Sequence, residues 1–360
     1  MRITQKDIAR SLGLSLITVT RALNGKQRVS DETRNLVQHF AKEHGYVPHR
    51  ASQVLVRNKT RQVALFSSTL PLYFWDRIRQ GVDTAAAHLH GYNFDVQYHA
   101  IPDHDTDAYL TTIQEEIDRG VDALAFVNQP IYNMDAVLKL VEKSGIPYVT
   151  FNVDAPTRGR LCFIGPDYVA GGRLAAEVIA TCLQFKADPL VLVIADNQFD
   201  RPESSGININ ADRLRGFLDV IRTRFPRVRY DIRYVETGLQ SDAKNDVIVK
   251  LLDEMKHKVD AVYLIPAINP QFLDALEAVD YSGKITLVHD LDPTAQRQLD
   301  RHLLTAVIHQ NPVLQGYNAV KILERIVEDG IAAPLDSVEI AHNVIFAENK
   351  AVARNWFELM

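Results

Sequence analysis

Cysteine is scarce in this chain, and long apolar runs are absent. The 360 residues include 2 cysteines, Cys162 and Cys182, which lie inside apolar segments. Two such residues do not make a disulfide framework, so we expect buried thiols in a reducing compartment. The sequence begins without the apolar stretch of a signal peptide, and no run of about 18 apolar residues could span a bilayer. These absences predict a cytoplasmic protein with no membrane partner.

The short motifs of common enzymes and metal sites are also missing. None of the patterns G-x-S-x-G, G-x-x-x-x-G-K-[ST], H-E-x-x-H or strand-linked G-x-G-x-x-G occurs. The acidic run at residues 103–107 begins like a calcium loop, but Ala108 stands where that loop needs glycine, so we interpret it as a capped helix start. His88 and His90 lack further ligands nearby, which favours surface histidines. We predict no catalytic residue, no metal and no cofactor.

Acidic residues are few at one end of the chain. Residues 1–61 contain 12 lysines and arginines against 4 acidic residues, a net charge of +8, whereas residues 62–360 carry −13. Positive charge attracts nucleic acid because phosphate contacts release condensed counterions. The first segment is therefore expected to bind a polyanion, and the remainder is not.

Residues 4–46 have the pattern of three short helices that close one small core. Gly13 ends the first helix in a tight turn, while Ser15 and Ser30 are placed to cap the second and third. The order helix, turn, helix is a DNA-reading motif. The residues expected to face inward are Ile8, Ala9 and Leu12, then Val19, Ala22 and Leu23, and finally Leu36, Val37, Phe40 and Ala41.

The second helix, within SLITVTRALN, exposes an isoleucine one turn before an arginine. In the major groove of DNA, Arg21 can bind guanine O6 and N7, and Ile17 can pack on a thymine methyl. Leu16 is a second candidate for an apolar contact with a base edge. The hydroxyl and amide side chains of this segment suit hydrogen bonds to phosphates. The expected DNA-binding residues here are Ser15, Leu16, Ile17, Thr18, Thr20, Arg21 and Asn24.

From Gln62 onward, apolar β-branched runs alternate with segments of helical period. Strict alternation of strand and helix predicts an α/β fold with parallel sheets covered by helices on both faces. One barrel or two smaller doubly wound lobes would fit, and periodicity alone does not choose between them. The expected strands are residues 63–68, 94–100, 123–128, 148–153, 191–195, 261–266, 285–290 and 306–310.

The first sixty residues resemble the DNA-binding headpiece of the LacI/GalR family of bacterial transcription regulators. The family's motif falls on Ala9, Gly13, Thr18 to Arg21, Asn24, Val29, Ser30 and Gly45 to Pro48, with Thr20 where serine is usual. The resemblance implies a headpiece at residues 1–46, a hinge helix or linker at 47–61, and an effector-binding and dimerisation domain at 62–360. It also selects two lobes like those of type I periplasmic sugar-binding proteins, the first at about 62–163 and 292–324 and the second at about 164–291 and 325–360.

The linker is polar and basic, with Pro48 at its head and an isolated Leu55. In relatives this segment orders as a hinge helix on the operator, where a leucine from each subunit enters the minor groove and kinks the duplex. Leu55 matches that leucine, and Arg50 suits a phosphate contact beside it. Ser52 stands where alanine is usual in the family.

The resemblance further implies a small sugar or polyol as effector, bound between the lobes. Ligands of open parallel sheets lie beyond the carboxyl ends of strands. Phe74 and Trp75 are placed there to stack on a sugar ring, and Asn128 and Asn152 end strands. The residues that match sugar-binding positions of relatives are Arg213, Asp290 and Gln310, whereas Ile268 and Asn269 replace the usual Asn-Asp pair.

Together these features predict a repressor that acts as a homodimer on palindromic double-stranded operator DNA. The final VARNWFELM carries no leucine heptads, which favours a dimer over a tetramer. An alternative is a solute-binding or sugar-acting enzyme domain in which DNA binding is secondary. Within the regulator class, an activator or a co-repressor-dependent regulator also fits.

Overall fold

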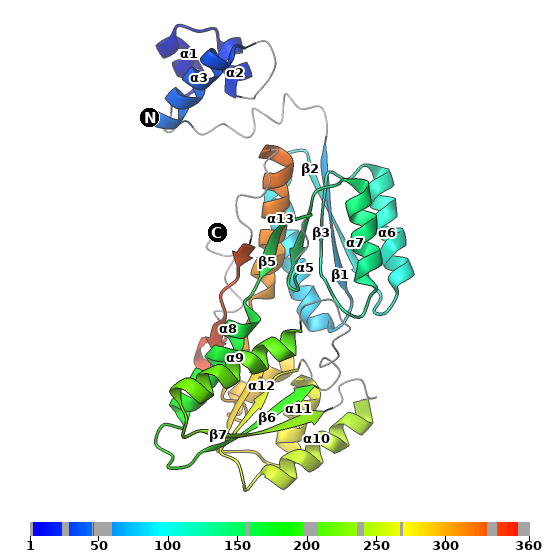
Figure 1. Ribbon diagram of the computed structural model, residues 1–360, viewed down its shortest axis with the longest axis vertical. Helices are drawn as coiled ribbons and strands as arrows, with labels where there is room; N and C mark the ends of the chain where they lie inside the picture. Colours follow the sequence, from blue (N-terminus) through cyan, green and yellow to red (C-terminus); the bar gives the residue numbers. More distant parts are fainter. Residues whose placement is uncertain are drawn as a thin grey trace. The chain divides into compact units, whose positions relative to one another are not determined.

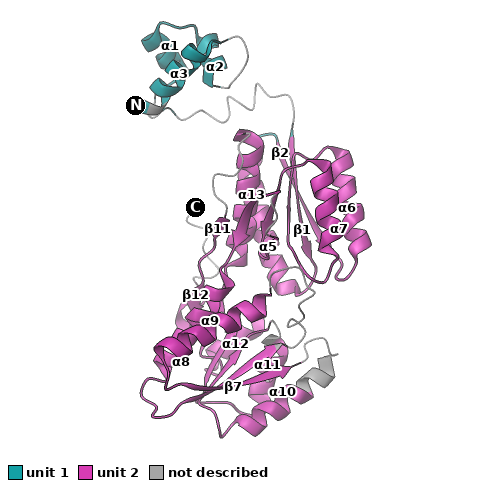
Figure 2. Ribbon diagram, in the orientation of Figure 1, with its two compact units in different colours: residues 1–60, 91–93 teal, residues 61–90, 94–360 magenta. Residues whose placement is uncertain are grey.

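The computed structural model describes residues 3–23, 29–44, 46, 60–155, 159–196, 208–235, 241–266, 269–329 and 337–351. The chain forms two compact units, one of residues 1–60 with 91–93 and one of residues 61–90 with 94–360 (Figure 2). Within the described parts, no helix combines the length and apolar character that a bilayer crossing requires. The same parts hold no group of three or more His, Cys, Asp or Glu side chains that could bind a metal.

The first unit contains helices α1 (Gln5–Leu12), α2 (Leu16–Leu23) and α3 (Asp31–Glu43). Ser15 and Ser30 accept hydrogen bonds from the backbone of Thr18 and Thr33, at 3.1 and 3.2 Å, as expected of N-caps. Leu36 was expected inside but is 52% exposed, because it lies beside the stripe that α3 buries instead of within it. The buried core consists of Ile8, Ala9, Val19, Ala22, Val37 and Ala41.

The first lobe of the second unit is built on a parallel sheet of order β11-β5-β4-β3-β1-β2. Its strands are β1 (Arg61–Ser68), β2 (Phe94–Ile101), β3 (Ala123–Phe126), β4 (Tyr148–Phe151), β5 (Arg160–Gly165) and β11 (Ser337–Glu339). One face of the sheet packs on α5 (Leu72–Leu89) and α13 (Pro312–Asp329), the other on α6 (Thr106–Arg119) and α7 (Met134–Ser144) (Figure 1).

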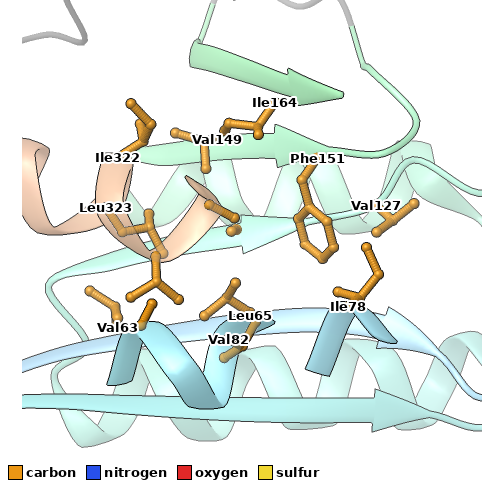
Figure 3. Close-up of a cluster of buried hydrophobic side chains, with 14 of the residues drawn as sticks. Val63, Leu65, Ile78, Val82, Val127, Val149, Phe151, Ile164, Ile322 and Leu323 are labelled. Atoms are coloured by element: carbon orange, nitrogen blue, oxygen red, sulfur yellow. The ribbon is translucent and has the colours of Figure 1, made fainter. Parts of the chain in front are cut away.

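Successive side chains of β1 point alternately to the two faces of the sheet, and both faces are covered by helices. Val63 and Leu65 belong to the cluster under α5 and α13, whereas Ala64 and Phe66 belong to the cluster under α6 and α7. Figure 3 shows Val63 and Leu65 with side chains from α5, α13 and neighbouring strands. A strand covered by helices on both sides is continuously apolar, which is why the run was recognisable.

The second lobe repeats this arrangement with sheet order β12-β10-β9-β8-β6-β7, in which β10 and β12 pair antiparallel. Its strands are β6 (Leu190–Asp196), β7 (Arg229–Val235), β8 (Ala261–Leu264), β9 (Ile285–His289), β10 (Ala306–His309) and β12 (Asn343–Ile345). Helices α8 (Tyr168–Cys182) and α9 (Ile209–Arg224) cover one face. The other carries α10 (Ser241–Met255), α11 (Asn269–Ala278) and α12 (Pro293–Asp300), and a 3-10 turn η1 (Ala347–Asn349) follows β12.

The chain passes between the two sheets at residues 166–167, 310–311 and 340–342. These crossovers confirm two lobes instead of one barrel. The lobe boundaries differ from those expected, because β10 pairs with β9 in the second sheet and α13 packs in the first lobe up to Asp329. Residues 292–309 thus belong to the second lobe and residues 337–339 to the first, a distinction that depends on strand pairing and not on periodicity.

Three smaller expectations can be compared with the structure. Asp105 caps α6 by accepting a 2.8 Å hydrogen bond from the backbone of Ala108, which confirms the capped helix start. His88 and His90 are exposed, as expected. Cys162 is buried, but Cys182 is exposed, contrary to prediction, because it lies off the stripe of α8 that the sheet covers.

Candidate nucleic-acid and effector sites

The outer face of α2 combines apolar and basic side chains. Ile17 is 64% exposed and Leu16 is 47% exposed, while Arg21, one turn further on, is partly exposed. On the opposite side Val19 and Ala22 are fully buried in the core. An exposed isoleucine contributes nothing to this core, so the face is suited to a partner that offers apolar and hydrogen-bonding groups together.

The hydroxyl groups of α2 already make internal hydrogen bonds. Ser15 Oγ and Thr18 Oγ1 lie 2.8 Å apart, and because one donates to the other, one hydroxyl hydrogen of the pair stays available for a phosphate oxygen. Thr20 Oγ1 lies 2.8 Å from both Leu16 O and Gln5 Oε1. Its single hydrogen is used within the headpiece, which favours a role in joining α1 to α2. The phosphate contacts themselves stay predictions, and Asn24, Arg50, Ser52 and Leu55 lie outside the described residues.

In the second unit, polar side chains follow the ends of strands from both sheets. Asn152 directly follows β4 and Asp290 directly follows β9, with φ values of +60° and +66°. Asparagine and aspartate tolerate this left-handed backbone better than most residues. The two residues therefore turn the chain where the sheet ends and place an amide and a carboxylate there.

A chain of hydrogen bonds joins these two strand ends. Asn152 Nδ2 donates to Gln315 Oε1 at 3.1 Å, and Gln315 Nε2 donates to the carbonyl of Gln310 at 2.8 Å. Gln310 Nε2 in turn donates to Asp290 Oδ1 at 2.8 Å. All four residues are buried. Because Gln310 lies on a crossover, the chain connects the first lobe to the second.

Arg213 of α9 lies in the same region and is 3% exposed. Its Nη1 donates to the carbonyl of Ile265 at 3.1 Å, and its guanidinium carbon lies 5.6 Å from the centre of the Tyr168 ring. The Tyr168 hydroxyl donates to the carbonyl of Asn152 at 2.7 Å, which ties Arg213 to the same group. We call these residues the crossover site and add Tyr73 of α5, whose pKa is affected by burial and by the charges of Asp290 and Arg213. The site consists of Tyr73, Asn152, Tyr168, Arg213, Asp290, Gln310 and Gln315.

Several buried atoms of the crossover site have no hydrogen-bond partner among the described residues. They are Arg213 Nε, Gln310 Oε1 and the hydroxyl of Tyr73. Burial raises the pKa of Tyr73, and the charges of Asp290 and Asp292 raise it further. Buried polar atoms are normally satisfied, so this donor, this acceptor and this hydroxyl are polar groups that a ligand could pair.

The structure groups the expected ligand residues in part. Asn152, Arg213, Asp290 and Gln310 lie in the crossover site, and their contact with a ligand stays a prediction. Asn128 instead donates to the carbonyl of Asp154 at 2.7 Å and is not part of the chain of hydrogen bonds. Phe74 and Trp75 are almost fully buried in the core of the first lobe, and the Trp75 indole donates to the carbonyl of Leu70 at 2.9 Å. Their stacking on a sugar stays a prediction.

Sequence reasoning missed Tyr73, Tyr168 and Gln315. Each lies in the first turn of a helix that begins just beyond a strand end or a crossover, at Leu72, Tyr168 and Pro312. That position was the available signal, because the first turns of such helices point toward the same edge of the sheets as the strand ends.

Comparison with known proteins gives the same division of the chain. Residues 4–49 match the lacI family of bacterial regulatory proteins, and residues 63–331 match the periplasmic binding protein domain. Catabolite control protein A of Staphylococcus epidermidis is 26% identical over 157 residues, 43% of this chain and 45% of that protein. The Staphylococcus aureus protein of the same name is 24% identical over 196 residues, 54% of this chain and 56% of that protein. The chain thus spans about half the length of these curated relatives.

Solved structures share the fold of the second unit. An ABC transporter solute-binding protein from Burkholderia graminis, solved with D-arabinose, has a TM-score of 0.68 and 20% identity, covering 81% of this chain and 97% of that one. A glucose-galactose binding protein from Geobacillus stearothermophilus has a TM-score of 0.65 and 21% identity, covering 81% and 99%. The chain therefore belongs to the periplasmic binding protein domain family, and in front of that domain it carries the headpiece of the lacI family of bacterial regulatory proteins.

Proposed function

We propose that this protein is a sequence-specific DNA-binding transcription regulator whose DNA affinity is controlled by a small sugar or polyol held between the two lobes. The observation that carries the proposal is the exposed Ile17 in a helix-turn-helix unit that matches the lacI family. That unit precedes a domain of the periplasmic binding protein family.

The DNA-binding part of the proposal is supported by charge and by the surface of α2. The first 61 residues carry a net charge of +8, which supplies sequence-independent affinity for phosphates. Leu16, Ile17 and Arg21 then provide apolar and bidentate contacts to base edges. We further propose a repressor that binds a palindromic operator as a homodimer, since two such helices read two half-sites related by symmetry.

The effector part is supported by the unpaired groups of the crossover site. Hydroxyl groups of a ligand can donate to Gln310 Oε1 and accept from Arg213 Nε, which lack hydrogen-bond partners among the described residues. Because Gln310 lies between the lobes, a ligand that binds it changes the relative stability of lobe arrangements. By linkage, such a ligand changes operator affinity and operator changes ligand affinity by the same factor.

Binding is proposed in place of catalysis. The Asp290 carboxylate accepts a hydrogen bond from Gln310, and Arg213 and Asn152 are also hydrogen-bonded inside the site. Groups engaged in this way orient a ligand better than they transfer a proton. LacI-family regulators and sugar-binding proteins are typically non-enzymatic, in agreement with this role. We place the protein in the cytoplasm, where its operator would be.

The test uses the purified full chain in two steps. Selection of duplex DNA from a random pool is expected to enrich a palindromic sequence, and the enriched duplex should bind at least a hundredfold more tightly than a scrambled one at 150 mM salt. A thermal-shift panel of pentoses, hexoses and polyols, including D-arabinose and myo-inositol, is expected to contain a compound that raises the melting temperature. Equal binding of enriched and scrambled DNA would contradict the regulator, and turnover of a panel sugar would favour an enzyme.

A further inference from the structure

Tyr168 contacts both lobes with one side chain. It is the first residue of α8, directly after the crossover at residues 166–167, and is 5% exposed. Its hydroxyl donates to the carbonyl of Asn152 in the first lobe at 2.7 Å. Its ring centre lies 5.6 Å from the guanidinium carbon of Arg213 in the second lobe. The side chain therefore connects an arginine of the crossover site to the backbone of the opposite lobe.

Helix α8 constrains Arg213 at two points. Gly172 follows Tyr168 by one helical turn, so the two residues lie on the same face of α8. A Cβ added at Gly172 would lie 1.9 Å from the carbonyl oxygen of Arg213, which shows that the backbones of α8 and α9 are in close contact there. The Tyr168 ring lies at the other end of the arginine, beside its guanidinium. The backbone and the charged end of Arg213 are thus both held by the same helix.

The Tyr168 ring contributes to the orientation of the guanidinium. Nη1 of Arg213 donates to the carbonyl of Ile265 at 3.1 Å, and its Nε has no hydrogen-bond partner among the described residues. An aromatic face attracts a cation, and the attraction is stronger where water is excluded, as it is around the buried Arg213. Because the guanidinium is planar, the carbonyl and the ring together set the direction of its Nε–H group. This contact depends on the ring and needs no hydroxyl.

The Tyr168 hydroxyl depends on the arrangement of the lobes, whereas its ring contact does not. Asn152 follows β4 of the first lobe, and Tyr168 and Arg213 both belong to helices of the second. A relative movement of the lobes would carry the ring and the guanidinium together but would separate the hydroxyl from its acceptor. A hydrogen bond is lost once its donor and acceptor atoms are more than about 3.5 Å apart. The bond therefore stabilises the arrangement in which Tyr168 reaches the Asn152 carbonyl.

We propose that Tyr168 is a positioning residue with two separable roles: its ring orients Arg213 for the effector, and its hydroxyl couples effector binding to the first lobe. This inference rests on the proposed function. An effector bound to Arg213 fixes the guanidinium and, through the ring contact, the position of Tyr168. The hydroxyl then favours the lobe arrangement that keeps its bond to Asn152. The first lobe begins at Arg61, directly after the DNA-binding unit in the chain, so this preference changes operator affinity.

The test measures effector affinity and coupling separately on the full chain. D-arabinose, D-glucose, D-galactose and myo-inositol are titrated calorimetrically, and the tightest binder to the wild type is then added to gel shifts with the selected duplex. Tyr168→Phe keeps the ring, so binding of that compound should weaken less than about threefold, while the fold-change that it causes in operator affinity should fall to less than about half. Tyr168→Leu removes the ring as well, so binding should weaken at least about tenfold because the charged donor Arg213 is no longer oriented.

Tyr132→Phe is the matched control. Tyr132 is also 5% exposed, and its hydroxyl donates to the carbonyl of Ile101 at 2.9 Å within the first lobe. The variant loses the same kind of bond without affecting a contact between lobes, so it should keep the wild-type affinity and fold-change. An unchanged fold-change in Tyr168→Phe, equal losses of affinity in Tyr168→Phe and Tyr168→Leu, or a reduced fold-change in Tyr132→Phe would overturn this inference and leave the proposed function standing. Binding of none of the four compounds to the wild type would contradict both.

Discussion

At the scale of single residues, we expect Arg21 to contribute to the preference for one DNA sequence more than to general affinity for DNA. Removing its side chain deletes a bidentate contact to guanine, worth about 1–3 kcal/mol of discrimination against a wrong base. Arg21→Ala should therefore lose most of its preference for the selected duplex over a scrambled one, while salt-sensitive binding survives. Competition gel shifts at several salt concentrations measure both quantities.

The control for that variant is Arg10→Ala. Arg10 carries the same charge on α1 of the same unit, and its side chain is 77% exposed in a weak pair with Asp7. Arg10→Ala should weaken binding to the selected and the scrambled duplex by a similar factor. If Arg21→Ala behaves like Arg10→Ala, Arg21 does not contact base edges.

The buried histidines predict how stability depends on pH. The pKa of His309 is lowered to about 4, mainly by burial, whereas it is near 6.5 in an unfolded chain. The unfolded state therefore takes up protons first, and the stability that neutral His309 contributes is complete above pH 6.5 and falls as pH drops toward 4. Between pH 7.5 and 5.5 the free energy of unfolding should decrease by about 1–2 kcal/mol from this group.

Urea unfolding at the two pH values measures that decrease. His309→Gln should show a smaller difference between pH 7.5 and 5.5 than the wild type. The exposed His90 supplies the comparison, and His90→Gln should keep the wild-type difference. A difference in His309→Gln as large as that of the wild type would show that His309 does not carry the effect.

At the scale of elements, close helix packing positions Arg213. A Cβ added at Gly172 of α8 would lie 1.9 Å from the carbonyl oxygen of Arg213, and one at Gly216 of α9 would lie 2.0 Å from that of Val169. Gly172→Ala must therefore push α8 and α9 apart and move Arg213, at a cost of about 1–3 kcal/mol in stability. We expect loss of the sugar-induced rise in melting temperature at any ligand concentration that saturates the wild type.

A second glycine distinguishes this effect from simple destabilisation. Gly81 of α5 makes an equally close approach, since its added Cβ would lie 1.9 Å from the carbonyl oxygen of Val313 in the first lobe. Gly81→Ala should lower the melting temperature to a similar extent and retain the ligand-induced rise. Loss of the rise in both variants would mean that Gly172 does not act through Arg213.

The strands and site residues also show which features could be predicted from the sequence. The runs at 63–68 and 191–195 were recognisable as strands because both faces of β1 and β6 are covered, so every position in them is buried and nearly all are apolar. Strand β7 escaped notice because it lies at the edge of its sheet and reads RYDIRYV, with polar and exposed positions. Arg213, Asp290 and Gln310 were found through the family resemblance, whereas Tyr73 and Gln315 were missed because their roles depend on which strand ends meet.

At the scale of the whole molecule, Gln315 connects the two lobes through a chain of side-chain hydrogen bonds, in addition to the bond from Tyr168 to Asn152. It accepts from Asn152 of the first lobe and donates to Gln310 on the crossover, which holds Asp290 of the second. Gln315→Met keeps the side-chain length but removes both bonds. The ligand should still bind Arg213 and Gln310 with an affinity within about tenfold of wild type, because neither of the two lost hydrogen bonds is made to the ligand.

Gln315→Met should weaken the coupling between ligand binding and operator binding. Ligand changes operator affinity only to the extent that it prefers one lobe arrangement, and a broken chain leaves the first lobe less dependent on the ligand. The ratio of operator affinities with and without ligand should shrink, and linkage requires that the ratio of ligand affinities with and without operator shrink by the same factor. Gln298→Met removes another buried glutamine, bonded to Glu277 within the second lobe, and should keep the wild-type ratio. A wild-type ratio in Gln315→Met would instead place the connection between ligand and operator in a different part of the chain.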